Sequence, residues 1–466
     1  MALNRTSLAC IALALAAPSL ALAQSNDSSV FIGQDGRDNA AAIAQNGDTN
    51  QAGSDAVPMR QQGLYNDISI LQSGLSNSIG LTAPGVFQLG EFTTATTHNS
   101  IDIEQRTNDN VVGSVVQRAL GAVPHGANAL VVRQAIGEAN VLNSVNQTQE
   151  AGEARQEAMV EQFGLRNVVD RVEQFANSVD RLEQNYIRIT MEGNFNGRLS
   201  LEGYAAIPDT ADSSILQQAE SEDSKANGNI ADLLIYGDDN RFGIRQGGRL
   251  NTTGLLTLSG DANQIGLRQD GTENDISVAA IDGDGNNIGV DQYGTNVVTL
   301  DLIGQSGSNG VLVRQQGTNR LSAQIEGNRN TITGDQDYDA GLGGQNEATV
   351  GVTGSDNAAH LAQRGSNLFV LGVTGDQNNA AGLLSPEARA LGLEAGYFTQ
   401  TGSGNAATMT VEGDRNLFAT SQTGLANIFF LDVQGNDNEA ALLQASSGNT
   451  ASVRQRGSEN VALIRQ

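Results

Sequence analysis

The tetrapeptide Gly-x-x-Asn recurs along this chain at a nearly fixed interval. From Gly237 it returns after 11, 12, 11 and 12 residues, and from Gly402 after 11 and 11. Glutamine keeps twice that interval, with steps of 23 from Gln246 to Gln315 and of 22 from Gln400 to Gln466. Self-similarity at a fixed short period is the signature of a solenoid, in which each repeat packs only against its neighbours. One repeat is therefore 22–23 residues, made of two half-units of 11–12.

Each half-unit reads as a short strand followed by a turn. Residues alternate between apolar and polar in Asn274 to Ile281 and in Asn296 to Leu302, which is the period of a strand. Glycine followed by small polar residues suits a tight turn. Two strands and two turns cannot bury a face alone, but stacked copies can. We therefore predict an all-β fold, a β-solenoid (flattened β-helix) of tandem strand-turn-strand-turn repeats, with roughly 15–18 rungs over about 70–85 Å.

The regular glutamines and asparagines predict side-chain ladders inside this coil. An amide that stacks on its own copy in each rung satisfies both its donors and its acceptor. For the glutamines at the strand ends we favour such a ladder, whereas the asparagines fit a ladder and solvated turn residues equally well. The predicted ladder residues are Gln246, Gln269, Gln292, Gln315, Gln400, Gln422, Gln444, Asn240, Asn251, Asn263, Asn274, Asn416, Asn427 and Asn438. The predicted turn glycines are Gly237, Gly248, Gly260, Gly271, Gly413, Gly424 and Gly435.

The repeats divide the chain into segments. We predict a secretory signal peptide over 1–23, repeats over 24–80, 101–204 and 229–466, and inserted loops over 81–100, 205–228, 335–346 and 384–399. Residues 167–184 also carry a helical stripe of apolar residues, but their Asn-x6-Gln spacing favours rungs. The signal assignment rests on Arg5, the apolar run Leu8 to Ala17 and the small residues before Gln24. A membrane anchor is the less favoured alternative for this segment.

Composition excludes several classes of protein. Asp and Glu total 52 against 26 for Lys and Arg, so an acidic chain with net charge −26 should repel phosphate backbones, and we expect no nucleic acid as partner. Aromatic residues make up only 4% and Trp is absent, which is unlike the core of a large enzyme. The one cysteine, Cys10, lies in the predicted signal, so the mature chain would hold no disulfide or thiolate metal site.

The sequence shows no motif of catalysis or cofactor binding. His98, His125 and His360 are scattered without metal-ligand spacing, and we expect them to be exposed. The frequent carboxylates, such as Asp238, Asp261, Asp284, Asp376 and Asp414, fall at turns, where we expect them to be solvated. Asp335-x-Asp337-x-Asp339 and Asp282-x-Asp284-x-Asn286 present alternating oxygen ligands but lack the closing Glu of a calcium loop. We therefore predict no catalytic residue, no bound cofactor and no metal site, and no enzyme.

The pattern Gln-x-Gly-x-x-Asn-x-[Ala/Val/Ile]-x-x-x-Gln resembles the curlin repeat of curli fibre subunits. The clearest copies begin at Gln34, Gln61, Gln72, Gln162, Gln269 and Gln422. Curlin repeats carry Gln in both strands, whereas alternate half-units here replace it, at Leu258, Ile281, Val373 and Val411 among others.

The resemblance implies a secreted structural subunit of a functional amyloid in the biofilm matrix, on the surface of a Gram-negative bacterium. Such a subunit, like a pilus protein, mediates cell adhesion and aggregation. Its partners would be copies of itself, a curli-type outer-membrane export pore and a nucleator subunit. Two alternatives stay open: a non-polymerising acidic surface adhesin or calcium-dependent β-roll, and, less favoured, a polysaccharide-acting enzyme on a β-helix.

Overall fold

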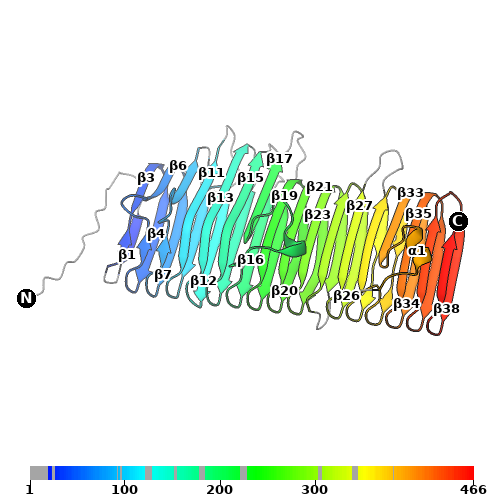
Figure 1. Cartoon of the computed structure of the whole chain (residues 1–466). Coiled ribbons are helices and arrows are strands. Elements are labelled where there is room, and N and C mark those ends of the chain that lie inside the picture. The colour runs from blue at the N-terminus through cyan, green and yellow to red at the C-terminus, as the bar shows by residue number, and fades with distance from the viewer. Residues whose placement is uncertain are drawn as a thin grey trace, which may run out of the picture. The chain divides into compact units, whose positions relative to one another are not determined.

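The computed structural model describes residues 19–23, 27–91, 93–94, 97–120, 128–151, 155–177, 184–220, 228–302, 307–337, 345–380 and 382–466. The chain forms two compact units, unit 1 from Met1–Ser200 and Thr210–Asn251, and unit 2 from Leu201–Asp209 and Thr252–Gln466. Both are β-solenoids, as the repeat predicts. In each unit two parallel sheets, here called A and B, lie face to face, and the chain passes back and forth between them along the unit (Figure 1).

Unit 1 alternates between the two sheets, and its first passages through sheet B are each divided into two short strands, such as β5 and β6. Every pairing within its sheets is parallel, as between β4 and β7 or between β13 and β15. Sheet A contains β1 (Ser19–Ala23), β4 (Ala40–Asn46), β7 (Asp67–Ser73), β10 (Ser100–Gln105), β12 (Asn128–Ile136), β14 (Arg155–Phe163), β16 (Gln184–Glu192) and β18 (Ile230–Tyr236). Sheet B contains β2 (Ser29–Val30), β3 (Ile32–Arg37), β5 (Gln51–Ala52), β6 (Met59–Leu64), β8 (Ser78–Ile79), β9 (Val86–Gly90), β11 (Val111–Ala119), β13 (Val141–Ala151), β15 (Val168–Asn177), β17 (Ser214–Glu220) and β19 (Arg241–Arg249).

Unit 2 repeats the arrangement and adds two short helices, η1 (Gly203–Ala205) and α1 (Pro386–Ala390). Sheet A contains β20 (Thr252–Ser259), β22 (Asp275–Asp282), β24 (Asn296–Leu302), β26 (Asn319–Glu326), β28 (Asn346–Thr349), β29 (Val352–Thr353), β31 (Asn367–Val370), β32 (Val373–Thr374), β34 (Asn405–Glu412), β36 (Ile428–Gln434) and β38 (Thr450–Arg456). Sheet B contains β21 (Gln264–Thr272), β23 (Asn287–Gly294), β25 (Gly310–Gln316), β27 (Thr331–Asp337), β30 (Ala358–Arg364), β33 (Tyr397–Ser403), β35 (Leu417–Leu425), β37 (Glu439–Gln444) and β39 (Val461–Arg465).

The alternation of each strand decides what is buried. In β7, Ile68, Ile70 and Gln72 point inward and are at most 2% exposed, while the residues between them face outward. Most inward positions hold Ile, Val, Leu or Ala, so the space between the sheets is thin. In unit 2 it also holds a short phenylalanine stack, in which Phe398 lies 5.3 Å from Phe369 and 5.6 Å from Phe418 between ring centroids. Such offset aromatic pairs contribute beyond the area they bury.

The turn glycines stack so closely that no side chain fits between them. Gly413 has φ +120°, and a Cβ built there would lie 2.2 Å from the carbonyl oxygen of Gly435 in the next rung. The third turn residue also adopts positive φ, even where it is Arg415 or Leu250. The glycine therefore serves two needs, a left-handed backbone and direct backbone stacking.

All four predicted loops include strand residues and need correction. The segment 81–100 contains β9, and 205–228 contains β17, each of which fills its place in sheet B. In 335–346, β27 continues to Asp337, and 338–344 lie outside the described residues. These insertions lengthen the turns beside a strand and leave the strand itself in register, so the break in spacing hid the strands from the sequence analysis.

Of the predicted loop 384–399, residues 384–396 form an insertion that carries α1, whereas 397–399 belong to β33. Residues 168–177 form β15 rather than the alternative helix, and 178–183 lie outside the described part. Ser19–Ala23 of the predicted signal pair with β4 as strand β1, while 1–18 are not described. Among the described helices, neither has the length and apolar character needed to cross a membrane.

Candidate functional site

A continuous column of glutamine amides runs through sheet B of unit 2. Each Gln Nε2 donates to the Oε1 of the Gln in the next rung, over 3.2 Å from Gln269 to Gln292 and 2.8 Å from Gln422 to Gln444. The predicted Gln315 and Gln400 lie in the same column, joined through Gln336 and Gln363, which the sequence analysis did not name. The column ends where Gln444 donates to Gln466 at 2.8 Å. Except at this last, exposed residue, all of these amides are at most 1% exposed.

Sheet B of unit 1 carries the same column. It runs through Gln34, Gln61, Gln88, Gln117, Gln147, Gln174, Gln217 and the predicted Gln246, with Nε2 to Oε1 distances from 2.6 to 3.1 Å. The interior amides donate a second time to backbone carbonyls of sheet A, as Gln61 does to Ala40 at 2.8 Å and to Asn66 at 3.0 Å. The column thus ties the two sheets together as well as the rungs. The steps at β9 and β17 lie in the predicted loops, which is why period counting missed Gln88 and Gln217.

The equivalent position of sheet A differs between the two units. In unit 1 it holds a second glutamine column, Gln45, Gln72, Gln105, Gln134 and Gln162, and then changes to Met191 and Ile235. In unit 2 it is aliphatic in the described rungs until the last, where Val433 is followed by Gln455. Because its neighbour Val433 offers no amide donor, Gln455 Oε1 is buried without a hydrogen-bond partner among the described residues.

The asparagines form two further columns, one at each turn. In one, Asn438 Nδ2 donates to Asn416 Oδ1 at 3.1 Å, and the backbone N–H of Asn438 donates to the same oxygen at 3.0 Å. In the other, Asn427 donates to Asn405 and Asn251 to Asn229, both at 3.1 Å. The predicted Asn240, Asn263 and Asn274 occupy equivalent places, accepting or donating along the columns. All seven predicted asparagines are at most 1% exposed, so they are interior ladder residues and not solvated turn residues.

All seven predicted turn glycines have positive φ, from +92° at Gly248 to +127° at Gly435. Aspartates that directly follow turn glycines also accept hydrogen bonds from the backbone. Asp376 Oδ1 accepts the N–H of Ser355 at 2.7 Å, and Asp414 Oδ1 accepts that of Asp376 at 2.9 Å. Asp284 and Asp238 accept in the same way from Asp261 and Asn194. These carboxylates satisfy turn N–H groups of the preceding rung, which spacing alone did not reveal.

The segment Leu201–Asp209, which contains η1 and is here called the strap, lies across the outer face of sheet B in unit 2. A Cβ at Gly266 would lie 1.8 Å from the Ala205 oxygen, and one at Gly289 1.9 Å from the Tyr204 oxygen. Beside it, the buried Arg268 is paired with Asp291 at 2.7 Å and with Asp209 of the strap at 2.9 Å. Close contacts at Gly266 and Gly289 and the ion pair between buried Arg268 and exposed Asp209 hold the strap against the sheet.

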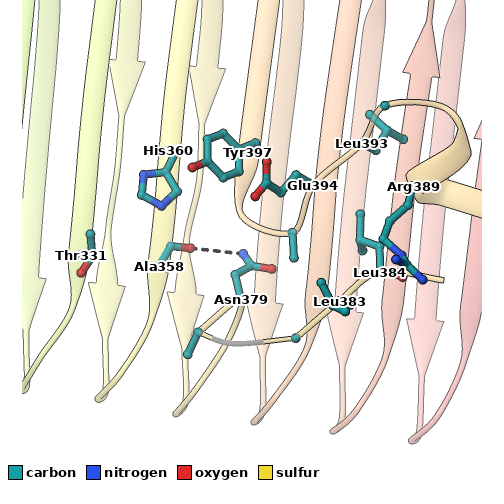
Figure 2. Close-up of a pocket in the computed structure, with 14 residues that line it drawn as sticks. Thr331, Ala358, His360, Asn379, Leu383, Leu384, Arg389, Leu393, Glu394 and Tyr397 are labelled. Atoms are coloured by element: carbon teal, nitrogen blue, oxygen red, sulfur yellow. Dashed lines mark hydrogen bonds between the residues drawn. The ribbon is translucent and has the colours of Figure 1, made fainter. Parts of the chain in front are cut away.

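A cavity of about 710 Å³ lies on the outer face of sheet B in unit 2. Its floor is Thr331, Ala358, His360 and Tyr397, and its wall is the insertion before β33 (Figure 2). His360 stacks on Tyr397 at 4.5 Å, and its Nδ1 shares a hydrogen bond of 2.9 Å with the Thr333 hydroxyl. The expectation of an exposed His360 is therefore wrong. Burial lowers the pKa of His360, and the nearby Glu394 partly opposes that shift.

Metal-binding geometry is absent from the described residues: no three His, Cys, Asp or Glu side chains lie close enough together to hold an ion. Of the two candidate calcium segments, the first contains Asp339, which is not described. In the second, Asn286 is fully buried and donates to Asn263 at 3.0 Å, so it points away from the turn carboxylates. His125 also lies outside the described part.

Comparison of this chain with protein-family models, with curated proteins and with solved structures found no match.

Proposed function

We propose that this chain is a secreted structural subunit of curli-like amyloid fibres in the biofilm matrix, and that it mediates adhesion and aggregation by rung-on-rung stacking. The observation that carries the proposal is the continuous buried column of glutamine amides. Successive rungs of one chain stack here in the way that separate chains stack inside a cross-β fibril. A column of this kind has no natural end, because each rung offers the next the same donors and acceptors.

The two ends of sheet B are open and complementary. At one end β3 pairs with β6 and at the other β39 pairs with β37, so in the described part of the chain each has one edge without a paired strand. Gln34 Nε2 donates inward to Gln61, and no described residue donates to its Oε1. Gln466 accepts from Gln444 and directs its own Nε2 to Thr450 at 3.2 Å, where an interior glutamine would also reach a following amide.

Among the described residues the amide column therefore has a direction, with the Oε1 acceptor of Gln34 at one end and the Nε2 donor of Gln466 at the other. A second copy that continues it must add its β3 to the β39 of the first. Such head-to-tail contacts do not close on themselves and generate filaments. The predicted export, the cell-surface location, the pore and the nucleator rest on the curlin resemblance alone.

Assembly of purified residues 24–466 with an amyloid dye tests this function, with Leu463→Pro as the blocking variant. The N–H of Gln466 donates inward to Leu443 at 2.8 Å, so strand alternation places the Leu463 N–H on the free edge. Proline there removes an outward donor while leaving the inward pairing of β39 in place. Leu463→Ala, which keeps the N–H, is the matched control.

We expect dye-positive fibres from the wild-type chain and from Leu463→Ala, and much slower assembly of Leu463→Pro at unchanged circular dichroism. If the wild-type chain stays a dye-negative monomer, the fibre function is wrong and the acidic adhesin is favoured. Fibres that form only with calcium and dissolve in a chelator would favour the β-roll alternative.

A further inference from the structure

The hollow beside His360 is a partly open cavity between the outer face of sheet B and the insertion before β33. Asn379 Nδ2 donates to the Ala358 carbonyl at 3.2 Å (Figure 2). The Oδ1 of Asn379 accepts the Phe418 N–H at 2.8 Å. Asn379 is 6% exposed, so both ends of this bridge are dry. The insertion after it is therefore pinned to sheet B where it leaves the solenoid.

The far side of the insertion is anchored as firmly. Leu384, Ala388 and Leu393 are buried against Ala419 and Ala441 on the outer face of β35 and β37. The Ser385 N–H and hydroxyl both bond the carboxylate of Glu439, at 3.0 and 2.6 Å, which fixes the start of α1. The wall of the cavity is thus preorganised and does not depend on a ligand to form.

The cavity combines apolar and polar groups in a way that suits few ligand classes. Leu383 and Leu393 supply apolar surface, and Tyr397, whose side of the cavity is open, supplies an aromatic edge and a hydroxyl. Glu394 and Arg389 line the same space, and their charges cancel. Because burial favours the neutral form of His360, the lining carries no net charge at neutral pH.

We propose that this cavity binds a neutral saccharide of one or two rings. Its volume lies within the range of small-ligand sites. A sugar ring offers an apolar C–H face for Tyr397 and hydroxyl groups that both donate and accept, which match His360, Glu394 and Arg389. An anion would meet Glu394 in a strongly acidic chain, and a purely apolar ligand would bury these polar groups without partners.

The lining also favours binding over hydrolysis. Glycoside hydrolysis uses a pair of carboxyl groups across the scissile bond. Among the lining residues Glu394 is the one carboxylate, and Glu439 is engaged by Ser385 beneath the helix. The inference is independent of fibre formation, since the cavity is built within one chain and none of its lining residues belongs to β3 or β39.

Saturation-transfer NMR and calorimetry on monomeric residues 24–466 test the inference, with cellobiose and N,N′-diacetylchitobiose as neutral probes and glucuronate as the anionic probe. Tyr397→Ala removes the aromatic edge, and Ala358→Trp fills the floor of the cavity. Tyr236→Ala, which removes a tyrosine of similar exposure from unit 1, is the matched control.

We expect at least one neutral probe to bind, with affinity lowered about tenfold by Tyr397→Ala and lost in Ala358→Trp, while Tyr236→Ala binds as the wild type does. Circular dichroism checks that each variant is folded. The proposal is overturned if neither neutral disaccharide binds, if glucuronate binds more tightly than both, or if binding survives in Ala358→Trp.

Discussion

The interiors of the two units solve the same packing problem with different chemistry. In the first rungs of unit 1 the strands of both sheets carry a buried glutamine, such as Gln105 in sheet A and Gln117 in sheet B, and these glutamines stack into one amide column in each sheet. In unit 2 sheet B keeps the amides, whereas sheet A is aliphatic through positions such as Ile281, Ile325 and Val411. The backbone path, the turn glycines and the asparagine columns are the same in both.

This difference separates two contributions to the fold. An aliphatic column gains free energy by burial but accepts a neighbour of any similar shape. An amide column adds little net free energy, yet a missing partner is costly, so it fixes which residue stacks on which. One buried amide in each rung is therefore enough to set the register of the rungs. In unit 2 the equivalent position of sheet A is used for apolar burial instead.

The turn glycines should be equally critical in both units, which tests the part of the comparison that does not change. We expect Gly413→Ala in unit 2 and Gly164→Ala in unit 1 each to cost more than about 3 kcal/mol, because the new Cβ would lie 2.2 and 1.9 Å from the next glycine oxygen. Gly392→Ala, at φ +78° with open space around it, should cost about 1 kcal/mol. Urea unfolding measures all three, and equal costs for Gly392 and Gly413 would contradict the stacking argument.

Removing one amide from a column should destabilise unit 1 strongly. Gln105→Leu would leave Gln72 Nε2 and Gln134 Oε1 without their side-chain partners, and we expect a loss of about 3 kcal/mol. Gln316→Leu, on an exposed position of β25, is the control and should change stability by less than about 0.5 kcal/mol. A loss no larger for Gln105 than for Gln316 would show that the column does not hold the rungs.

Introducing amides into the aliphatic column of unit 2 should show coupling. Val373 and Val411 are register partners in neighbouring rungs, so Val373→Gln alone buries an unpaired amide at a cost of about 2 kcal/mol. The double variant Val373→Gln/Val411→Gln lets the two amides pair, and we expect a favourable coupling of about 1 kcal/mol in a double-mutant cycle. Simple additivity would mean that neighbouring amides in this column do not recognise each other.

Two aspartates of unit 2 should give small pH effects of opposite sign. Burial raises the pKa of Asp275 above its ordinary 3.8. The contribution of Asp275 to the stability of the fold is therefore fully present below pH 3.8 and is lost as the pH rises through the raised pKa. The hydrogen bond from Arg415 lowers the pKa of Asp437, so its contribution is present above 3.8 and is lost as the pH falls through the lowered pKa. We expect Asp275→Asn to stabilise and Asp437→Asn to destabilise the protein at neutral pH, with both differences fading in acid. Urea midpoints of both variants across this range measure the effect, and a common sign at neutral pH would contradict it.

Much of the fold follows from periodicity, and its exceptions follow from where insertions fall. Spacing alone located the columns through Gln292, Gln422 and Asn438, because each side chain must meet its own copy one rung away. It missed Gln88 and Gln217, because long turns beside β9 and β17 shift the count without shifting the rung. The cavity at His360 could not be foreseen, since it depends on how the insertion before β33 folds back on the sheet.

The central claim is that copies of this chain continue one another's amide column. Electron cryomicroscopy of fibres grown from residues 24–466 tests it most directly. We predict strands perpendicular to the fibre axis at about 4.8 Å spacing, with Gln466 of one copy in register with Gln34 of the next. Fibres whose copies meet through the outer faces of their sheets, with β3 and β39 left unpaired, would contradict the account.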